Sequence, residues 1–286
     1  MVTLAALQKS PQAIAVQSSD VFWVDQGDSN QPDGAIMSVS AIGGIPTTIH
    51  SGDASPISLA IGSTAYYWVA SASGFNNVIY TEPQGTSTVT SLPNSSFAHA
   101  IVTDSVDIFW TAPETVQGYV MSEPVGGGAA LTLATGKAPY AIAADATHIF
   151  WTDVSDGTVN QMSKLGGAVT VLASNQYQPQ AIATDGSNVY WVDTAYQGSV
   201  MQTPIGGGAI TTLASSQSYP AAVTTDGASV YWANEISGGV NKVPVGGGTV
   251  VELVPNIDAI GVAVDSGSVY FLQGNLSGIV GKVTPK

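Results

Sequence analysis

The chain has 286 residues, of which 44% are hydrophobic and 9% are charged, and its 20 acidic and six basic side chains give a formal charge of −14 at pH 7. Nucleic acids and anionic membrane surfaces are bound by clusters of Lys and Arg, so this composition excludes both as partners. The absence of Cys excludes disulfides and thiolate metal sites. No apolar run approaches the ~18 residues that span a bilayer, so we expect no direct membrane insertion.

The first predicted element is a short strand over residues 2–7. It carries neither the basic nor the apolar region of a signal peptide, so we expect no export signal within this chain. After it, pairs of adjacent aromatic residues recur along the whole chain. Their second members lie 45, 42, 41, 40, 41 and 39 residues apart, which predicts an array of repeated units. The pairs are Phe22-Trp23, Tyr67-Trp68, Phe109-Trp110, Phe150-Trp151, Tyr190-Trp191, Tyr231-Trp232 and Tyr270-Phe271.

Each unit contains four short segments with the composition of strands. In the clearest copy these are residues 179–185, 188–193, 198–204 and 209–214, rich in β-branched and aromatic residues and bounded by Gly, Asp, Asn or Pro. Glycines at 206–208 separate the third segment from the fourth, where a tight hairpin needs positive φ. Four short strands about every forty residues predict a propeller blade.

The seventh unit lacks a fourth strand, and the segment 2–7 is suited to supply it. We therefore predict an all-β, seven-bladed β-propeller of four-stranded antiparallel blades, closed by the N-terminal strand. Residues 1–286 are expected to form a single domain. The predicted blades are approximately 11–55, 56–96, 97–138, 139–178, 179–219, 220–258, and 259–286 plus 2–10.

The second strand of each unit carries a resemblance to a known family. Residues 22–25, 150–153 and 190–193 resemble the Tyr-Trp-Thr-Asp (YWTD) repeat of low-density-lipoprotein-receptor propellers. NHL-type propellers and streptogramin B lyases are similar in strand pattern, and seven-bladed like the count here, whereas the receptor family is typically six-bladed. The resemblance implies the fold, and no catalytic residue is carried over from it. Four units replace the terminal Asp, with Ala70, Ala112, Asn234 and Gln273.

Composition and resemblance together favour a bacterial protein outside the cytoplasm, either secreted, periplasmic or at the cell surface. The low charge and the abundance of Ser, Thr, Gly and Asn are the observations behind this expectation.

The repeat register predicts which side chains surround the central axis. One ring of positions is chemically mixed, and the next ring inward is uniformly small, as expected where innermost strands converge. The mixed ring is Gln12, Ile57, His99, Tyr140, Gln180, Ala221 and Ile260, and the small ring is Ala13, Ser58, Ala100, Ala141, Ala181, Ala222 and Gly261.

Two functions are compatible with the face of the propeller on which the mixed ring lies. The first is a non-catalytic module that binds a small polar ligand, a glycan, a peptide or a protein through tyrosine stacking and amide hydrogen bonds. Its predicted binding residues are Gln12, His99, Tyr140, Tyr177, Gln180 and Tyr219. The alternative is a lyase or hydrolase at the channel mouth, in which His99 and Glu114 form a general acid/base pair.

The loop after the first aromatic pair contains candidate ligands for calcium. Asp25, Asp28 and Asp33 offer hard oxygen atoms, although the spacing of an EF-hand is absent. A second group of acids recurs at the turn after the first strand of a unit, where we expect the side chains to cap the turn. These are Asp104, Asp145, Asp185, Asp226 and Asp265. No other cofactor is expected.

Overall fold

The computed structural model describes residues 1–28, 31–73, 76–104, 106–114, 116–274 and 278–286. These residues form an all-β protein whose strands pair antiparallel with their neighbours. In the described part of the chain there is no helix, and thus none long and apolar enough to cross a membrane.

The strands are grouped in six sheets, five of four strands and one of seven. The sheet that joins the two ends of the chain contains, in order, β1 (Val2–Gln8), β27 (Gly278–Val283), β26 (Val269–Gln273) and β25 (Ala259–Val264). The seven-stranded sheet contains β2 (Pro11–Gln17), β3 (Asp20–Asp25), β4 (Gly34–Ser40), β5 (Thr47–Ile61), β6 (Ala65–Ser73), β7 (Asn76–Pro83) and β8 (Thr90–Ser91).

The other four sheets follow one another along the chain. The first contains β9 (Ile101–Thr103), β10 (Asp107–Ala112), β11 (Gly118–Pro124) and β12 (Leu131–Gly136). The second contains β13 (Pro139–Ala144), β14 (His148–Asp153), β15 (Thr158–Ser163) and β16 (Thr170–Ala173). The third contains β17 (Pro179–Thr184), β18 (Asn188–Asp193), β19 (Gly198–Pro204) and β20 (Thr211–Gln217). The fourth contains β21 (Pro220–Thr225), β22 (Ser229–Asn234), β23 (Gly239–Pro244) and β24 (Val251–Val254).

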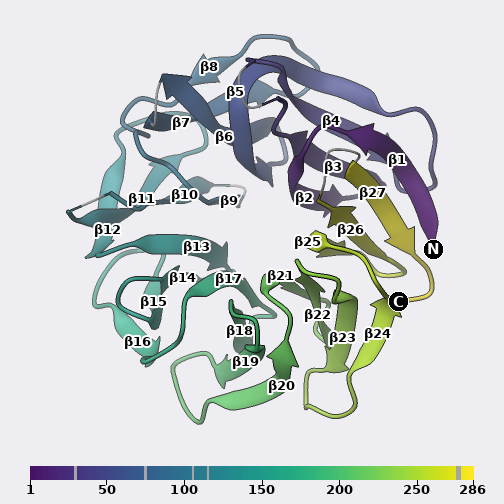
Figure 1. The fold of residues 1–286 in the computed structure, drawn as a ribbon. Coiled ribbons are helices and arrows are strands. Elements are labelled where there is room, and N and C mark those ends of the chain that lie inside the picture. The colour runs from purple at the N-terminus through teal and green to yellow at the C-terminus, as the bar shows by residue number, and fades with distance from the viewer. Residues whose placement is uncertain (29–30, 74–75, 105, 115, 275–277) are drawn as a thin grey trace.

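The sheets are arranged as a ring around a central axis (Figure 1). The innermost strands contact one another in the order β2, β5, β9, β13, β17, β21, β25 and back to β2. The two ends of the chain meet in this ring, because β1 pairs with β27 and the N and C labels lie near each other (Figure 1).

Strand β5 accounts for the large sheet. Its first part pairs with β4, from Thr47 to Asp53, and its second part pairs with β6, from Ala54 to Ile61. One continuous strand of 15 residues therefore serves as the outermost strand of one four-stranded group and the innermost strand of the next. The sequence pattern, read as two separate strands here, did not predict this continuity.

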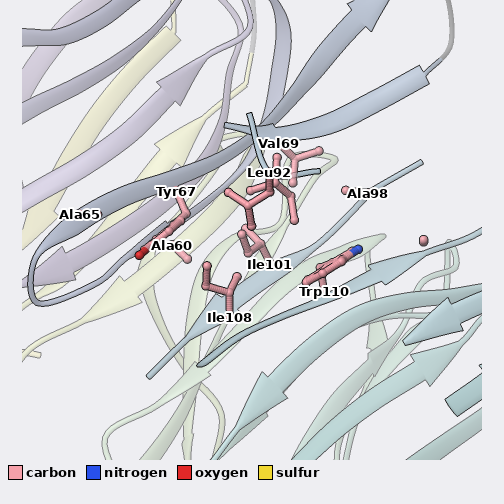
Figure 2. Packing of buried hydrophobic residues seen from close by; sticks show 11 residues of the cluster. Ala60, Ala65, Tyr67, Val69, Leu92, Ala98, Ile101, Ile108 and Trp110 are labelled. Atoms are coloured by element: carbon pink, nitrogen blue, oxygen red, sulfur yellow. The ribbon is translucent and has the colours of Figure 1, made fainter. Parts of the chain in front are cut away.

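The aromatic pairs hold neighbouring sheets together. Successive strand residues point to opposite faces, so the two rings of a pair enter different cores. Phe109 packs in a cluster with Trp151, while Trp110 packs in another with Tyr67 (Figure 2). The same arrangement recurs in every hydrophobic cluster of the described residues, including the one that contains Tyr270 and Trp23. Burying both rings of a pair contributes roughly 1.5–3 kcal/mol per side chain.

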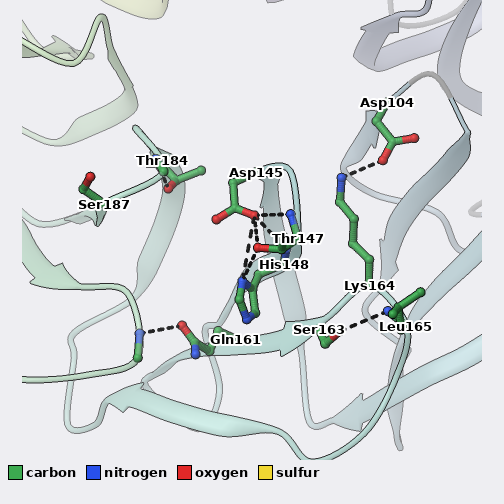
Figure 3. A network of polar contacts seen from close by, with 12 residues as sticks. Asp104, Asp145, Thr147, His148, Gln161, Ser163, Lys164, Leu165, Thr184 and Ser187 are labelled. Carbon is green, nitrogen blue, oxygen red and sulfur yellow. Dashed lines mark hydrogen bonds and ion pairs between the residues drawn. The ribbon is translucent and has the colours of Figure 1, made fainter.

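The recurring aspartates cap turns, as the sequence predicts. Oδ1 of Asp145 accepts hydrogen bonds from the backbone N–H groups of Thr147 at 2.6 Å and His148 at 2.7 Å (Figure 3). The same pair of bonds is made by Asp104, Asp185, Asp226 and Asp265. Two of these aspartates also pair with a lysine from the adjacent sheet. Lys164 Nζ lies 2.6 Å from Oδ2 of Asp104 (Figure 3), and Lys286 Nζ lies 2.5 Å from Oδ2 of Asp226.

Candidate functional site

A pocket of about 470 Å³ opens at the centre of the ring. All seven residues of the mixed ring line it, together with Ser10, Pro11, Glu235 and Gly274. Below it a second cavity of about 310 Å³ is lined by all seven residues of the small ring. The register of the repeat thus brings one side chain from each innermost segment to a common opening.

β-Bulges explain how these side chains come to face the axis. The ladder between β2 and β3 shifts register between Pro11 and Ala13, which leaves Gln12 unpaired. The same irregularity skips Gln180 between Pro179 and Ala181. A bulge frees one residue from the ladder and re-aims its side chain. Equivalent shifts span Ile57, Tyr140, Ala221 and Ile260.

The residue before the bulge is strained in several segments. Ser10, Gln178 and Tyr219 precede a proline and have φ values of 53°, 47° and 52°. A left-handed conformation is uncommon for residues other than glycine and concentrates at sites where the surrounding structure imposes it. The surrounding structure therefore imposes an uncommon backbone conformation where the chain enters these innermost strands.

His99 and Tyr140 form the polar aromatic part of the pocket. Their ring centroids are 4.0 Å apart and the planes are inclined by 39°. His99 Nδ1 lies 3.3 Å from the carbonyl oxygen of Tyr140, which also accepts a 2.6 Å hydrogen bond from Thr111 Oγ1. Because a carbonyl can only accept, Nδ1 carries the proton and Nε2 is left as an acceptor in the neutral ring.

Burial sets the charge state of this pair. It lowers the pKa of His99, which keeps the imidazole neutral at pH 7. Burial, and then the charge of Glu235, raises the pKa of Tyr140, whose hydroxyl stays protonated. The pocket accordingly offers neutral donors and acceptors, with one carboxylate at its edge.

The carboxylate of the pocket is Glu235, which sequence reasoning did not place in the site. It follows β22, three residues after Trp232. Glu114 stands four residues after Trp110, and Pro113 occupies the position equivalent to Glu235. Glu114 consequently lines a separate pocket, so the structure does not bring it together with His99. Counting from the aromatic pair shows that the two acids occupy different positions of the repeat.

Two glutamines and two tyrosines complete the predicted set. Gln12 Nε2 donates to Oε1 of Gln26 at 3.3 Å, and Gln180 lines the pocket from β17. Tyr177 is 64% exposed, and Tyr219 is half-buried with its ring 6.3 Å from that of Tyr196. Neither Tyr177 nor Tyr219 belongs to the lining of the central pocket.

Two of the three candidate calcium ligands form ion pairs with a lysine. Nζ of Lys9 lies 2.6 Å from Oδ2 of Asp33 and 3.3 Å from Oδ2 of Asp28. Asp25 is buried, and burial raises the pKa of its carboxyl to about 6. Within the residues that the structure describes, no group of three or more His, Asp or Glu side chains is placed to hold a metal ion.

No family model and no curated protein matches the chain. Among solved structures it is similar to a streptogramin B lyase, with a TM-score of 0.77, 14% identity and coverage of 98% of this chain and 96% of that chain. An inactive virginiamycin B lyase from Staphylococcus aureus with quinupristin gives a TM-score of 0.77, 15% identity and coverage of 99% and 97%.

A nidogen/laminin complex is also similar, with a TM-score of 0.58, 22% identity and coverage of 68% of this chain and 76% of that chain. At these identities the likeness concerns the fold, which is that of the propellers. The resemblance to YWTD and streptogramin lyase propellers predicted from the sequence is confirmed at this level.

Proposed function

We propose that the protein is a binding module that holds a neutral polar ligand, a glycan or a peptide, in the central pocket. The observation that carries this proposal is the lining of that pocket. Its volume of about 470 Å³ suits a ligand of one or two sugar or amino-acid units, and its lining combines two glutamine amides, a neutral histidine and a tyrosine with apolar side chains. Amides and hydroxyls bind neutral polar groups through paired hydrogen bonds.

The alternative is an enzyme with a His-centred site in the same pocket. The specific observation that favours it is the free Nε2 acceptor of a neutral His99, which is the form that a general base requires. The partner acid in this version is Glu235, because Glu114 lines another pocket. The similarity to lyase structures concerns the fold alone and does not extend to their substrates.

The two versions predict different results on glycan and peptide arrays. A binding module should retain a ligand that the double variant Gln12→Ala/Gln180→Ala releases, and mass spectrometry should recover that ligand unchanged. Gln84→Ala is the matched control, because Gln84 bonds to Gly62 O at 3.0 Å in a turn that does not contribute to the pocket. If the double variant still binds the ligand, the central pocket is not the binding site and the proposal is wrong. If the ligand is recovered chemically modified, the enzyme alternative is correct.

The ring is further proposed to consist of seven blades in one domain, closed by β1. On this interpretation the seven-stranded sheet is two blades that share β5, since its two halves pair with different partners. The circular contact order of seven innermost strands supports the count. The pairing of β1 with β27 supports the closure. The blades then begin near residues 11, 56, 97, 139, 179, 220 and 259, as the repeat indicates.

The location outside the bacterial cytoplasm also remains a proposal. It is supported by the low proportion of charged residues, 9%, and by the abundance of small polar side chains. A fusion of the natural gene product to a reporter active only outside the cytoplasm would test it.

A further inference from the structure

Another pocket, of about 330 Å³, lies beside Trp110 and apart from the two cavities on the central axis. Its lining includes Asn94, Ser96, Glu114, Tyr119 and Met121. Trp110 is fully buried, and its Nε1 has no hydrogen-bond partner in the described structure. In Figure 2 this nitrogen points away from the apolar side chains that surround the rest of the ring. A buried donor without an acceptor is rare in folded proteins and calls for an explanation.

The other repeats show what is missing. In four of them the residue 15 positions before the tryptophan supplies the acceptor. Trp23, Trp191 and Trp232 donate to Oε1 of Gln8, Gln176 and Gln217 at 2.9, 3.0 and 2.8 Å, and Trp68 donates to Oδ2 of Asp53 at 2.6 Å. The residue 15 positions before Trp151 is Gly136, and the residue 15 positions before Trp110 is Ser95.

The three glutamines use their amides in the same way. Besides accepting from the indole, Gln8, Gln176 and Gln217 each donate Nε2–H to the backbone oxygen two residues earlier, at 2.8, 2.8 and 2.9 Å. Each of these three repeats thus builds a cradle for one primary carboxamide, with the indole N–H as donor and a backbone carbonyl as acceptor.

The backbone of this cradle is retained next to Trp110. The residue before each of the three glutamines is left-handed, with φ of 59° at Leu7, 58° at Asn175 and 56° at Ser216. Asn94, which precedes Ser95, has φ of 60°. Asn94 therefore shares this backbone conformation, but the hydroxyl of Ser95 is engaged elsewhere, donating to Leu92 O at 2.8 Å and accepting from Ile79 N at 2.9 Å.

We propose that the pocket beside Trp110 binds a primary carboxamide of an external ligand, of the kind carried by a glutamine or asparagine side chain of a peptide. The carbonyl oxygen of the ligand accepts from Trp110 Nε1, in the place that Gln176 Oε1 takes beside Trp191. Its NH₂ group donates to the carboxylate of Glu114 in the pocket lining. This site is independent of the function proposed for the central pocket.

The test follows indole N–H signals in ¹H–¹⁵N NMR spectra of the full chain. Trp110→Phe identifies the signal of Trp110 by its disappearance. Titration with propionamide, and then with N-acetylglutamine methylamide, should move that signal in a saturable way and leave those of Trp191 and Trp232 in place. 2-Butanone, which offers a carbonyl without the NH₂ group, should move it less at equal concentration.

Two variants make the outcome decisive. Ser95→Gln restores the internal amide, so the Trp110 signal should shift in the free protein and lose its response to propionamide. Gln176→Ser combined with Asp193→Ala reproduces beside Trp191 the Ser95 and Ala112 that flank Trp110, so the Trp191 signal should gain a response. If the Trp110 signal of the wild type does not move in the titration, the proposal is wrong, and a bound water molecule is then the expected partner of this N–H. An equal response in Ser95→Gln overturns it as well. If Ser95→Gln does not fold, the gain at Trp191 in the Gln176→Ser/Asp193→Ala variant decides, and its absence counts against the proposal.

Discussion

The indole N–H of Trp232 donates a 2.8 Å hydrogen bond to Oε1 of Gln217, which lies at the end of the preceding sheet. The same oxygen accepts from Nδ2 of Asn234 at 3.1 Å. One amide therefore joins two consecutive sheets and satisfies two donors of largely buried residues.

Gln217→Ala is expected to lower the free energy of unfolding by about 2 kcal/mol, because an unsatisfied buried donor costs roughly 1–3 kcal/mol. Thermal and urea denaturation followed by tryptophan fluorescence would measure the change. Gln84→Ala, which removes a single bond to a turn carbonyl, should cost clearly less. Equal losses in the two variants would contradict the role given to the amide.

Leu4→Ala should destabilise the protein by about 2–5 kcal/mol, the usual range for emptying a buried leucine site. Leu4 is 7% exposed and packs in the cluster of Tyr270 and Trp23, where the two ends of the chain meet. Leu7 lies in the same strand and is 79% exposed, so Leu7→Ala is the matched control and should change stability little. If Leu4→Ala leaves the urea midpoint unchanged, the packing of β1 against this cluster contributes nothing to stability.

Stability is expected to pass through a maximum between pH 3.8 and about 6. Burial raises the pKa of Asp25 and of Asp193 from 3.8 to about 6. The folded state then binds more protons than the unfolded state in this range, so stability rises as the pH falls from 7 towards 4.

Below pH 3.8 the direction reverses. Burial opposes the ionised form of Asp226, but hydrogen bonds from Lys286, Ser229 and Tyr231 hold its pKa below the ordinary value. Protonating such a group removes stability. Asp25→Asn should raise the melting temperature at pH 7 and flatten its change between pH 7 and 5. A melting temperature that falls steadily from pH 7 to 4 in the wild type would contradict this account.

His99→Ala separates the two versions of the central site. In a binding module the loss of one hydrogen-bonding group, worth about 1 kcal/mol, weakens affinity by roughly fivefold. In an enzyme the same change should abolish turnover. Isothermal titration with the ligand found on the arrays, combined with mass spectrometry of that ligand, measures both quantities on one sample. His99→Gln should recover part of the affinity in the first case and none of the turnover in the second.

The sequence predicted the repeat and the lining of the channel because both depend on local periodicity. Counting from Asp185 located Gln12, His99 and Tyr140 at one opening, and all three line it. The bulges that aim these side chains were not predicted, since a register shift depends on the partner strand. The continuity of β5 was also missed, because its middle residues carry the turn composition of Ser51 to Ser55.

The site was predicted less fully than the scaffold. Glu114 and Glu235 differ by one position relative to their aromatic pairs, and only the structure shows that this places them in different pockets. The acceptors of the tryptophan N–H groups were present in the sequence at a fixed distance of 15 residues, as in Gln176 and Trp191, but the distance gains meaning only when the turn between two sheets is known.

The two rings of each aromatic pair pack into different hydrophobic clusters, and this determines how the protein can be truncated or circularly permuted. The aromatic rings of each four-stranded group pack into hydrophobic clusters with both neighbouring groups, so no group has a complete hydrophobic core of its own. An excised group would expose the apolar side chains of two incomplete clusters to water. The two ends of the chain are adjacent, so a short linker could join them and the chain could begin at another place in the ring (Figure 1). New termini introduced in any exposed turn, with the old ones linked, leave every core whole.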